Sequence, residues 1–132
     1  MKTIKNVAII GCGYWGTNIV KTLLSFKNLH IFCYDNNITN LLKIKKRFKN
    51  VTIVDNFKTI LNDKDLKLTF ICVPVSQIFS IAKHCIINKK NVFLEKPGVT
   101  KISELKNLNL ISLKNKCKLM FGYVYCYNDY IK

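Results

Sequence analysis

The apolar positions of this chain occur in short continuous runs that alternate with stretches of helical periodicity. Runs rich in β-branched and aromatic residues predict strands that are buried on both faces. Stretches in which apolar residues recur every three or four positions predict amphipathic helices. The predicted strands are residues 5–10, 30–34, 51–54, 68–73, 91–95 and 118–125, and the predicted helices are residues 18–26, 38–48, 56–61, 76–88 and 100–114.

This alternation predicts the fold class. Strands that alternate with helices through short connections are typical of a parallel sheet with helices on both faces. Neither an internal repeat nor a low-complexity linker divides the 132 residues. We therefore expect a single α/β domain over residues 1–132, a doubly wound parallel sheet of about six strands.

Proline and glycine mark the ends of two predicted strands. Pro74 ends the fourth strand, and Pro97 followed by Gly98 prevents the fifth from continuing. Beyond that turn, Thr100 is expected to cap the last helix, and Glu104 is favourably placed in its early turns.

The net charge raises the question of a nucleic-acid partner. The chain has 22 Lys and Arg residues against 7 Asp and Glu, a formal net charge of +15. Arg47 is the one arginine, although base and phosphate recognition favours the bidentate guanidinium. Lys, Asn and Ile share A/T-rich codons, so compositional drift of the genome accounts for the basicity at least as well. The main cationic cluster is expected at the outer end of an amphipathic helix: Lys43, Lys45, Lys46, Arg47 and Lys49.

Cysteine usage and hydropathy indicate a cytoplasmic location. The six cysteines contain no C-x-x-C pair, which favours reduced, buried thiols. His30 and His84 lie in unrelated segments, so we expect no metal site. The apolar runs are far shorter than the ~20 residues of a membrane span. The N-terminal apolar segment ends after four residues at Gly11, which argues against a signal peptide and against a membrane partner.

The first predicted strand is followed by a G-x-G-x-x-G motif, Gly11, Gly13 and Gly16. In such a Rossmann turn the first glycine permits a tight turn, the second admits a pyrophosphate and the third lets the helix pack against the strand. The helix N-terminus then offers free N–H groups and a positive dipole end to the phosphates. An ordinary tight turn is the alternative interpretation, but the strand before the motif and the helix after it favour dinucleotide binding.

Asp35 ends the second predicted strand, nineteen residues after Gly16. A carboxylate there can accept hydrogen bonds from the adenosine ribose and would repel a 2′-phosphate. The motif therefore favours NAD over NADP, although Lys43 could fold back and weaken that preference. The alternative is that Asp35 only forms a turn with the two asparagines that follow it.

Four segments together resemble the N-terminal domain of the Gfo/Idh/MocA oxidoreductases, in order and spacing over nearly the whole chain. They are the glycine loop with Tyr14 and Trp15, residues 71–76 with Val73 and Pro74, the tripeptide Glu95-Lys96-Pro97, and residues 122–128. The Glu-Lys-Pro tripeptide is the specific signal. The Gly-Tyr-Trp-Gly form of the loop is most similar to relatives that oxidise the 3-hydroxyl of nucleotide sugars such as UDP-N-acetylglucosamine.

This resemblance implies roles for individual residues. Lys96 would transfer a proton or orient the substrate beside the nicotinamide, in a partly buried crevice at the carboxyl end of a central strand. The cofactor would lie against Gly11, Gly13, Tyr14, Trp15, Gly16, Asp35, Val73, Pro74 and Glu95. A solvated lysine and a simple strand stop at Pro74 are the corresponding alternatives.

The chain also departs from the family. Ile78, Tyr123 and Val124 stand where relatives often have polar groups, and His84 is expected to be structural or partly exposed. The C-terminal substrate domain of the family is expected to be absent, so a separate subunit could supply it.

Three functions follow, in order of preference. The first is the cofactor half of an NAD-dependent dehydrogenase acting on a CH–OH group of a sugar, inactive on its own. The second is a non-catalytic dinucleotide-binding module or a degenerate remnant. The third is a basic nucleic-acid-binding protein.

Overall fold

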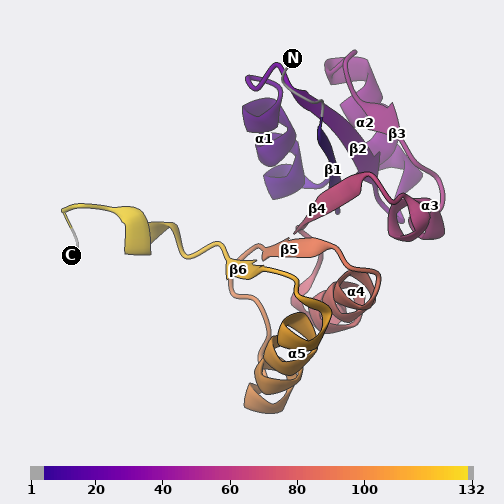
Figure 1. The fold of residues 1–132 in the computed structure, drawn as a ribbon. Coiled ribbons are helices and arrows are strands. Elements are labelled where there is room, and N and C mark those ends of the chain that lie inside the picture. The colour runs from indigo at the N-terminus through magenta and orange to yellow at the C-terminus, as the bar shows by residue number, and fades with distance from the viewer. Residues whose placement is uncertain (1–4, 131–132) are drawn as a thin grey trace.

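The computed structural model describes residues 5–130. Its strands are β1 (Lys5–Ile10), β2 (Leu29–Tyr34), β3 (Thr52–Ile53), β4 (Leu66–Ile71), β5 (Asn91–Leu94) and β6 (Leu119–Phe121). Its helices are α1 (Tyr14–Leu23), α2 (Ile38–Arg47), α3 (Phe57–Asn62), α4 (Val75–Ile87), α5 (Ile102–Asn115) and the short 3-10 helix η1 (Val124–Tyr127). Strands and helices alternate as the sequence predicts (Figure 1).

The strands form one six-stranded sheet in the order β3-β2-β1-β4-β5-β6, with every pairing parallel. The chain starts in the middle of the sheet, builds outward to β3 and then crosses back to β4. This reversal places a crevice between the carboxyl ends of β1 and β4. The predicted doubly wound α/β fold is confirmed.

Two apolar clusters hold helices on opposite faces of the sheet. On one face, Val7 and Ile9 of β1 pack with residues of α1 and α2, including Val20 and Ile44. On the other face, Ile10 belongs to a second cluster formed with β4, β5, α3, α4 and α5. Alternate residues of β1 therefore face different helices, as expected of a strand buried on both sides.

The two faces are not equally covered. Helices α4 and α5 lie over β4, β5 and β6 on one side, whereas α1 and α2 lie over β1, β2 and β3 on the other (Figure 1). Leu68 and Phe70 of β4 also pack against the cluster under α1 and α2, but among the described residues that cluster includes none from β5 or β6. The β5–β6 part of this sheet face is therefore open.

Several predicted boundaries are wrong in their detail. Helix α1 begins at Tyr14 rather than near residue 18, because the last glycine of the motif lies inside its first turn. Strand β4 lies two residues earlier than expected, although the Cys72 amide still donates to the Ile10 carbonyl at 2.8 Å. Strand β6 ends at Phe121. The Gly122 amide still donates to the Leu94 carbonyl at 2.8 Å, but the Tyr123 and Val124 amides bond to nearby carbonyls and the chain turns away as η1.

The cap of α5 also differs from the prediction. Lys101 rather than Thr100 occupies the N-cap position, and no side chain bonds there, but Glu104 does lie in the first turn. The basic cluster ends α2, as predicted, with Lys45, Lys46 and Arg47 in its last turn. Among the helices of residues 5–130, none combines the length and apolar character needed to cross a bilayer.

Candidate dinucleotide-binding site

A cavity of about 350 Å³ opens at the carboxyl ends of β1, β2 and β4. Its lining is Ile10, Gly11, Gly13, Tyr34, Asp35, Asn36, Asn37, Asn40, Cys72, Val73, Pro74, Gln77 and Ile81. It therefore brings together five residues that the sequence singled out, Gly11, Gly13, Asp35, Val73 and Pro74. The cavity lies at the reversal of strand order, where open α/β sheets bind their ligands.

Two glycines of the motif are required by packing. Gly11 has a φ of +92°, and a Cβ there would lie 2.5 Å from the Cys72 carbonyl oxygen. A Cβ on Gly16 would lie 1.9 Å from the Gly11 carbonyl oxygen. Backbone atoms cannot move aside far enough to accept a Cβ at these distances. Glycine at both positions therefore allows the turn, β4 and α1 to lie in close contact.

Gly13 serves a different purpose. A Cβ at Gly13 would meet no atom within 4 Å, so nothing inside the protein excludes a side chain there. Its φ of −70° is one that any residue adopts. Gly13 is the N-cap of α1 and makes no side-chain cap bond, so no cap side chain satisfies the first amides of the helix. The empty volume and the free amides together form a cradle for an anion such as a pyrophosphate.

Asp35 joins the loop to the rest of the site. Its Oδ2 accepts a hydrogen bond from the Cys12 amide at 2.7 Å and another from the Asn40 Nδ2 at 3.0 Å. Its Oδ1 accepts from the Asn37 amide at 2.7 Å, which is the local turn given as the alternative to ribose binding. The carboxylate thus holds the glycine loop and also lines the cavity, so the structural role and the predicted ligand role are compatible.

Several polar cavity residues were missed by sequence reasoning. Asn36, Asn37 and Asn40 follow Asp35, and Gln77 comes from the first turn of α4. The Thr17 hydroxyl donates to the Gly13 carbonyl at 2.7 Å and steadies the start of α1. The asparagines that follow Asp35 could have indicated a polar cavity wall, but asparagine is common throughout this chain, so they did not stand out.

The cysteines at the crevice are not poised as nucleophiles. A hydrogen bond with Cys33, reinforced by burial, raises the pKa of the Cys12 thiol. Burial, followed by the negative charge of Glu95, raises the pKa of Cys72 to about 12. A thiol must lose its proton to attack, so both groups act as packing residues.

The predicted catalytic segment lies at the end of β5. The Glu95 amide donates to the Ile71 carbonyl at 3.0 Å, which continues the pairing of β5 with β4. The Lys96–Pro97 peptide bond is cis. The Lys96 Nζ lies 5.6 Å from the centre of the Trp15 ring, and the Tyr14 and Trp15 rings meet edge to face at 5.2 Å. Lys96, Tyr14 and Trp15 therefore form one exposed group beside the start of α1.

This group does not match every expectation. Lys96 is exposed, so the partial burial expected of it is not found. Tyr14, Trp15, Gly16 and Glu95 do not line the cavity that holds Asp35. The predicted site residues thus divide into a cavity around the glycine loop and an open platform around Lys96.

Among the positions that depart from the family pattern, Tyr123 places a polar side chain beside the Glu95-Lys96-Pro97 segment, whereas Ile78 is apolar. Ile78 is buried in α4, and the Tyr123 hydroxyl donates to the Pro97 carbonyl at 2.9 Å. His84 is exposed, with its Nδ1 2.7 Å from the Ser80 carbonyl oxygen, which agrees with a structural histidine. In the described part of the chain, no three His, Cys, Asp or Glu side chains come together as a metal site would require.

Comparison with known proteins agrees with this geometry. A family model for Gfo/Idh/MocA, described as an oxidoreductase family with an NAD-binding Rossmann fold, matches residues 5–123. No curated protein matches the sequence.

Solved structures show the same fold. GenD2 from gentamicin A biosynthesis, solved with NAD, superposes with a TM-score of 0.89 at 20% identity, covering 98% of this chain and 37% of that chain. UDP-N-acetylglucosamine 3-dehydrogenase GnnA from Acidithiobacillus ferrooxidans gives 0.84 at 17% identity, covering 96% and 40%. KijD10, a 3-ketoreductase from Actinomadura kijaniata solved with NADP and TDP-benzene, gives 0.84 at 16% identity, covering 94% and 38%. This chain therefore spans less than half the length of these three proteins.

Proposed function

Because the chain belongs to the Gfo/Idh/MocA oxidoreductase family, we propose that it is the cofactor-binding part of an NAD-dependent dehydrogenase that oxidises a CH–OH group of a sugar. The observation that carries this proposal is the open space at Gly13, the N-cap of α1, in a cavity that also has the Asp35 carboxylate in its lining. An anion with a ribose attached fits that combination of donors and acceptor.

Different residues of the chain would contact different parts of the cofactor. The amides at the start of α1 would bind the pyrophosphate, and Asp35 would accept hydrogen bonds from the adenosine ribose. Val73 and Pro74 would pack against the cofactor from the end of β4. The carboxylate favours NAD over NADP, because a 2′-phosphate would add a second negative charge beside Asp35.

Lys96 is proposed to act on the substrate hydroxyl. NAD, when bound, supplies the acceptor for the hydride that leaves the alcohol carbon. Lys96 would hold the hydroxyl and, in its neutral amine form, accept the proton of that hydroxyl, while the Trp15 ring 5.6 Å away restricts where its Nζ lies. Because Lys96 is exposed here, this role requires a further surface that closes over it.

The substrate class is proposed by likeness to proteins of the same fold. GnnA is a UDP-N-acetylglucosamine 3-dehydrogenase, and KijD10 is a 3-ketoreductase solved with a TDP ligand. A nucleotide sugar oxidised at its 3-hydroxyl is therefore our specific proposal. The remaining surface of the substrate site would come from outside this domain, in an enzyme that works in the cytoplasm.

A non-catalytic dinucleotide-binding module is the second candidate. The observation in its favour is that the cofactor cradle is complete while Lys96 remains exposed and Ile78 and Val124 bring no polar groups. The two candidates share cofactor binding and differ only in turnover with a partner.

The test of cofactor binding is a titration with NADH that follows tryptophan fluorescence. Trp15 is the single tryptophan of the chain and lies next to Lys96, so bound NADH should quench its emission. Gly13→Val should abolish the quenching, because it fills the cradle while its backbone stays in a conformation that valine tolerates.

Thr22→Val is the matched control, since it places the same side chain on an exposed position of α1 far from the cradle. It should bind NADH like the unchanged protein. Equal binding by Gly13→Val and Thr22→Val would refute the proposed cradle. Binding of NADPH as tight as that of NADH would refute the role given to Asp35.

A further inference from the structure

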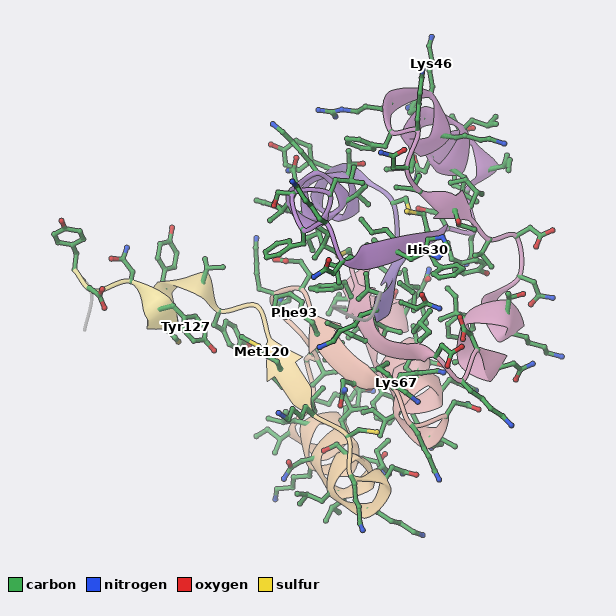
Figure 2. All side chains as sticks on the ribbon, turned by 45° about the horizontal axis from the view of Figure 1, so that its top comes forward. His30, Lys46, Lys67, Phe93, Met120 and Tyr127 are labelled. Carbon is green, nitrogen blue, oxygen red and sulfur yellow. The ribbon has the colours of Figure 1, made fainter. Side chains whose placement is uncertain are left out.

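A cavity of about 510 Å³ lies at the opposite end of the sheet from the glycine loop, where β4 and β5 begin and where α3 and α4 end. Figure 2 shows Lys67, the second residue of β4, on the side of the molecule away from the C-terminal segment that carries Tyr127. We call this space the lysine cavity. It is lined by Leu61, Asn62, Lys64, Lys67, Ile87, Asn88, Lys89 and Lys90.

The lining of the lysine cavity is unusual in its charge. Half of its residues are lysines and none is acidic. The lysines come from three separate segments, which are the turn after α3, the start of β4 and the turn between α4 and β5. Lysine is abundant in the whole chain, yet no lysine lines the cavity around the glycine loop. Composition alone therefore does not account for this concentration of positive charge.

Lys90 is the buried member of this group. It is 3% exposed, and its Nζ donates to the main-chain carbonyl of Asp63. The Asp63 carboxylate accepts hydrogen bonds from the Asn6 side chain and from the Asp65 and Leu66 amides. Within residues 5–130 no carboxylate forms an ion pair with Lys90, although buried cations in proteins are as a rule paired. The cavity thus contains a buried ammonium group without a counter-charge in contact with it.

The surroundings of Lys90 disfavour its charged form. Burial lowers the pKa of Lys90; the negative charge of Asp63 opposes this effect, and the positive charge of Lys67 adds to it. The other lysines of the cavity, Lys64, Lys67 and Lys89, are exposed. An anion bound between these groups would attract all of their ammonium groups at once and supply the missing counter-charge.

The lysines of the cavity are not needed to complete the end of α4. Cationic side chains often bind the free carbonyls at a helix C-terminus. Here the Asn88, Lys89 and Lys90 amides donate to carbonyls of the last turns of α4 at 2.9 to 3.1 Å. Backbone amides satisfy these carbonyls, so the Lys89 ammonium group is not required as a cap.

We propose that the lysine cavity binds a compact polyphosphorylated anion, a chain of phosphoryl groups that is either free or carried by a nucleotide. Lysine binds phosphate as a point charge on a flexible stem, so several lysines can follow a flexible chain of phosphates. The volume lies in the range of small-molecule sites, roughly 300–1,000 Å³. No aromatic side chain lines the cavity, which disfavours a nucleic-acid strand, whose bases stack on aromatic rings. The site is separate from the dinucleotide cavity and does not depend on the proposed function.

The test is isothermal titration of the full chain with tripolyphosphate in about 0.15 M salt. Replacing Lys67→Gln together with Lys89→Asn should weaken binding about tenfold, because two ammonium groups of the cavity are lost. Asparagine suits position 89, where φ is +59°. The matched control is Lys43→Gln with Lys46→Asn on α2, which removes the same charge from exposed positions away from the cavity and should bind like the unchanged chain.

Two further measurements locate the site and identify the source of the phosphates. Gly13→Val, which fills the dinucleotide cradle, should retain tripolyphosphate binding. A parallel titration of this variant with ATP separates the sources, because tighter binding than that of tripolyphosphate indicates a nucleotide and weaker binding indicates a free polyphosphate. Equal circular dichroism spectra check that every variant is folded.

Three results would overturn the proposal. Equal weakening by the two lysine pairs would show attraction by the net charge of the whole chain. Loss of tripolyphosphate binding in Gly13→Val, with full binding by the Lys67 and Lys89 pair, would place the anion in the dinucleotide cradle. A single-stranded oligonucleotide that binds more tightly than both small anions, and that the cavity pair weakens, would make nucleic acid the ligand. NADH quenching of tryptophan fluorescence is a separate readout, so failure of the proposed function is distinguishable from failure here.

Discussion

The crevice of this protein has two parts, the cavity around the glycine loop and the surface around Lys96. The described residues enclose the first part more completely than the second. Around the glycine loop, Gly11 lies so close to the end of β4 that an added Cβ would be 2.5 Å from the Cys72 carbonyl oxygen, and a cavity of about 350 Å³ is already formed. Around Lys96, an exposed ammonium group lies 5.6 Å from the centre of the half-exposed Trp15 ring.

The difference follows from where the residues of each part lie in the sequence. The cradle depends on a turn of six residues and on Asp35, which bonds directly to that turn. Placing a substrate carbon about 3–3.5 Å from a nicotinamide requires walls on opposite sides of the reacting atoms. A single sheet edge can therefore bind a cofactor but cannot by itself fix the geometry of hydride transfer.

The largest predicted effect is a loss of stability when Gly16, which packs the glycine loop against α1, is replaced. Gly16→Ala puts a Cβ 1.9 Å from the Gly11 carbonyl oxygen, so α1 or the loop must move. We expect a loss of about 3 kcal/mol or more in the free energy of unfolding, measured by urea denaturation. Gly13→Ala, which meets open space, should change that free energy by less than about 1 kcal/mol. Equal losses at the two positions would contradict the division of roles between these glycines.

A smaller effect is expected at Asp35. Asp35→Asn removes the negative charge but keeps an acceptor oxygen for the Cys12 amide. The preference for NADH over NADPH should narrow by about 1–3 kcal/mol, the range for hydrogen bonds to charged groups. Isothermal titration with both cofactors measures it. An unchanged preference would leave Asp35 with its structural role alone.

The Cys72 thiol is expected to make the free energy of unfolding depend on pH, by about 1 kcal/mol. Burial and then Glu95 raise the pKa of Cys72 to about 12 in the folded chain, above the usual value of a thiol. Above pH 9 the unfolded thiol loses its proton while the folded one keeps it, so the unfolded state is favoured as the pH rises. Unfolding free energies should fall between pH 8 and pH 10, and Cys72→Ala should make that fall shallower by about 1 kcal/mol. An identical slope in both proteins would contradict the buried, protonated thiol.

The smallest effect is expected at Lys96. Lys96→Ala should change NADH affinity by less than about threefold, since an exposed cation–π contact contributes only about 0.5–1 kcal/mol. The chain alone should show no measurable dehydrogenation of UDP-sugars or free polyols with NAD. If the purified chain did turn over such a substrate, and lost that activity on Lys96→Ala, the comparison of the two parts would be wrong while the role of Lys96 would be supported.

Much of this fold follows from local sequence patterns. The order of strands and helices is right throughout, because runs of β-branched residues and helical stripes are strong local signals. The boundaries are less well predicted where tertiary contacts decide them. At Gly16, a residue typical of turns lies within a helix because only a glycine fits against Gly11. At residues 122–125, a strand-like sequence turns away after Phe121 as η1.

The same distinction applies to the candidate site. The sequence by itself determined the glycine motif, the acidic end of β2 and the residues at the ends of β4 and β5, because each chemistry lies within a short segment. Only the tertiary structure decided that Asp35 bonds to the Cys12 amide, that Lys96 stays exposed over Trp15, and that the β5–β6 part of one sheet face is open. Those features depend on which distant segments meet across the sheet, and the periodicity of one segment carries no information about what packs against it.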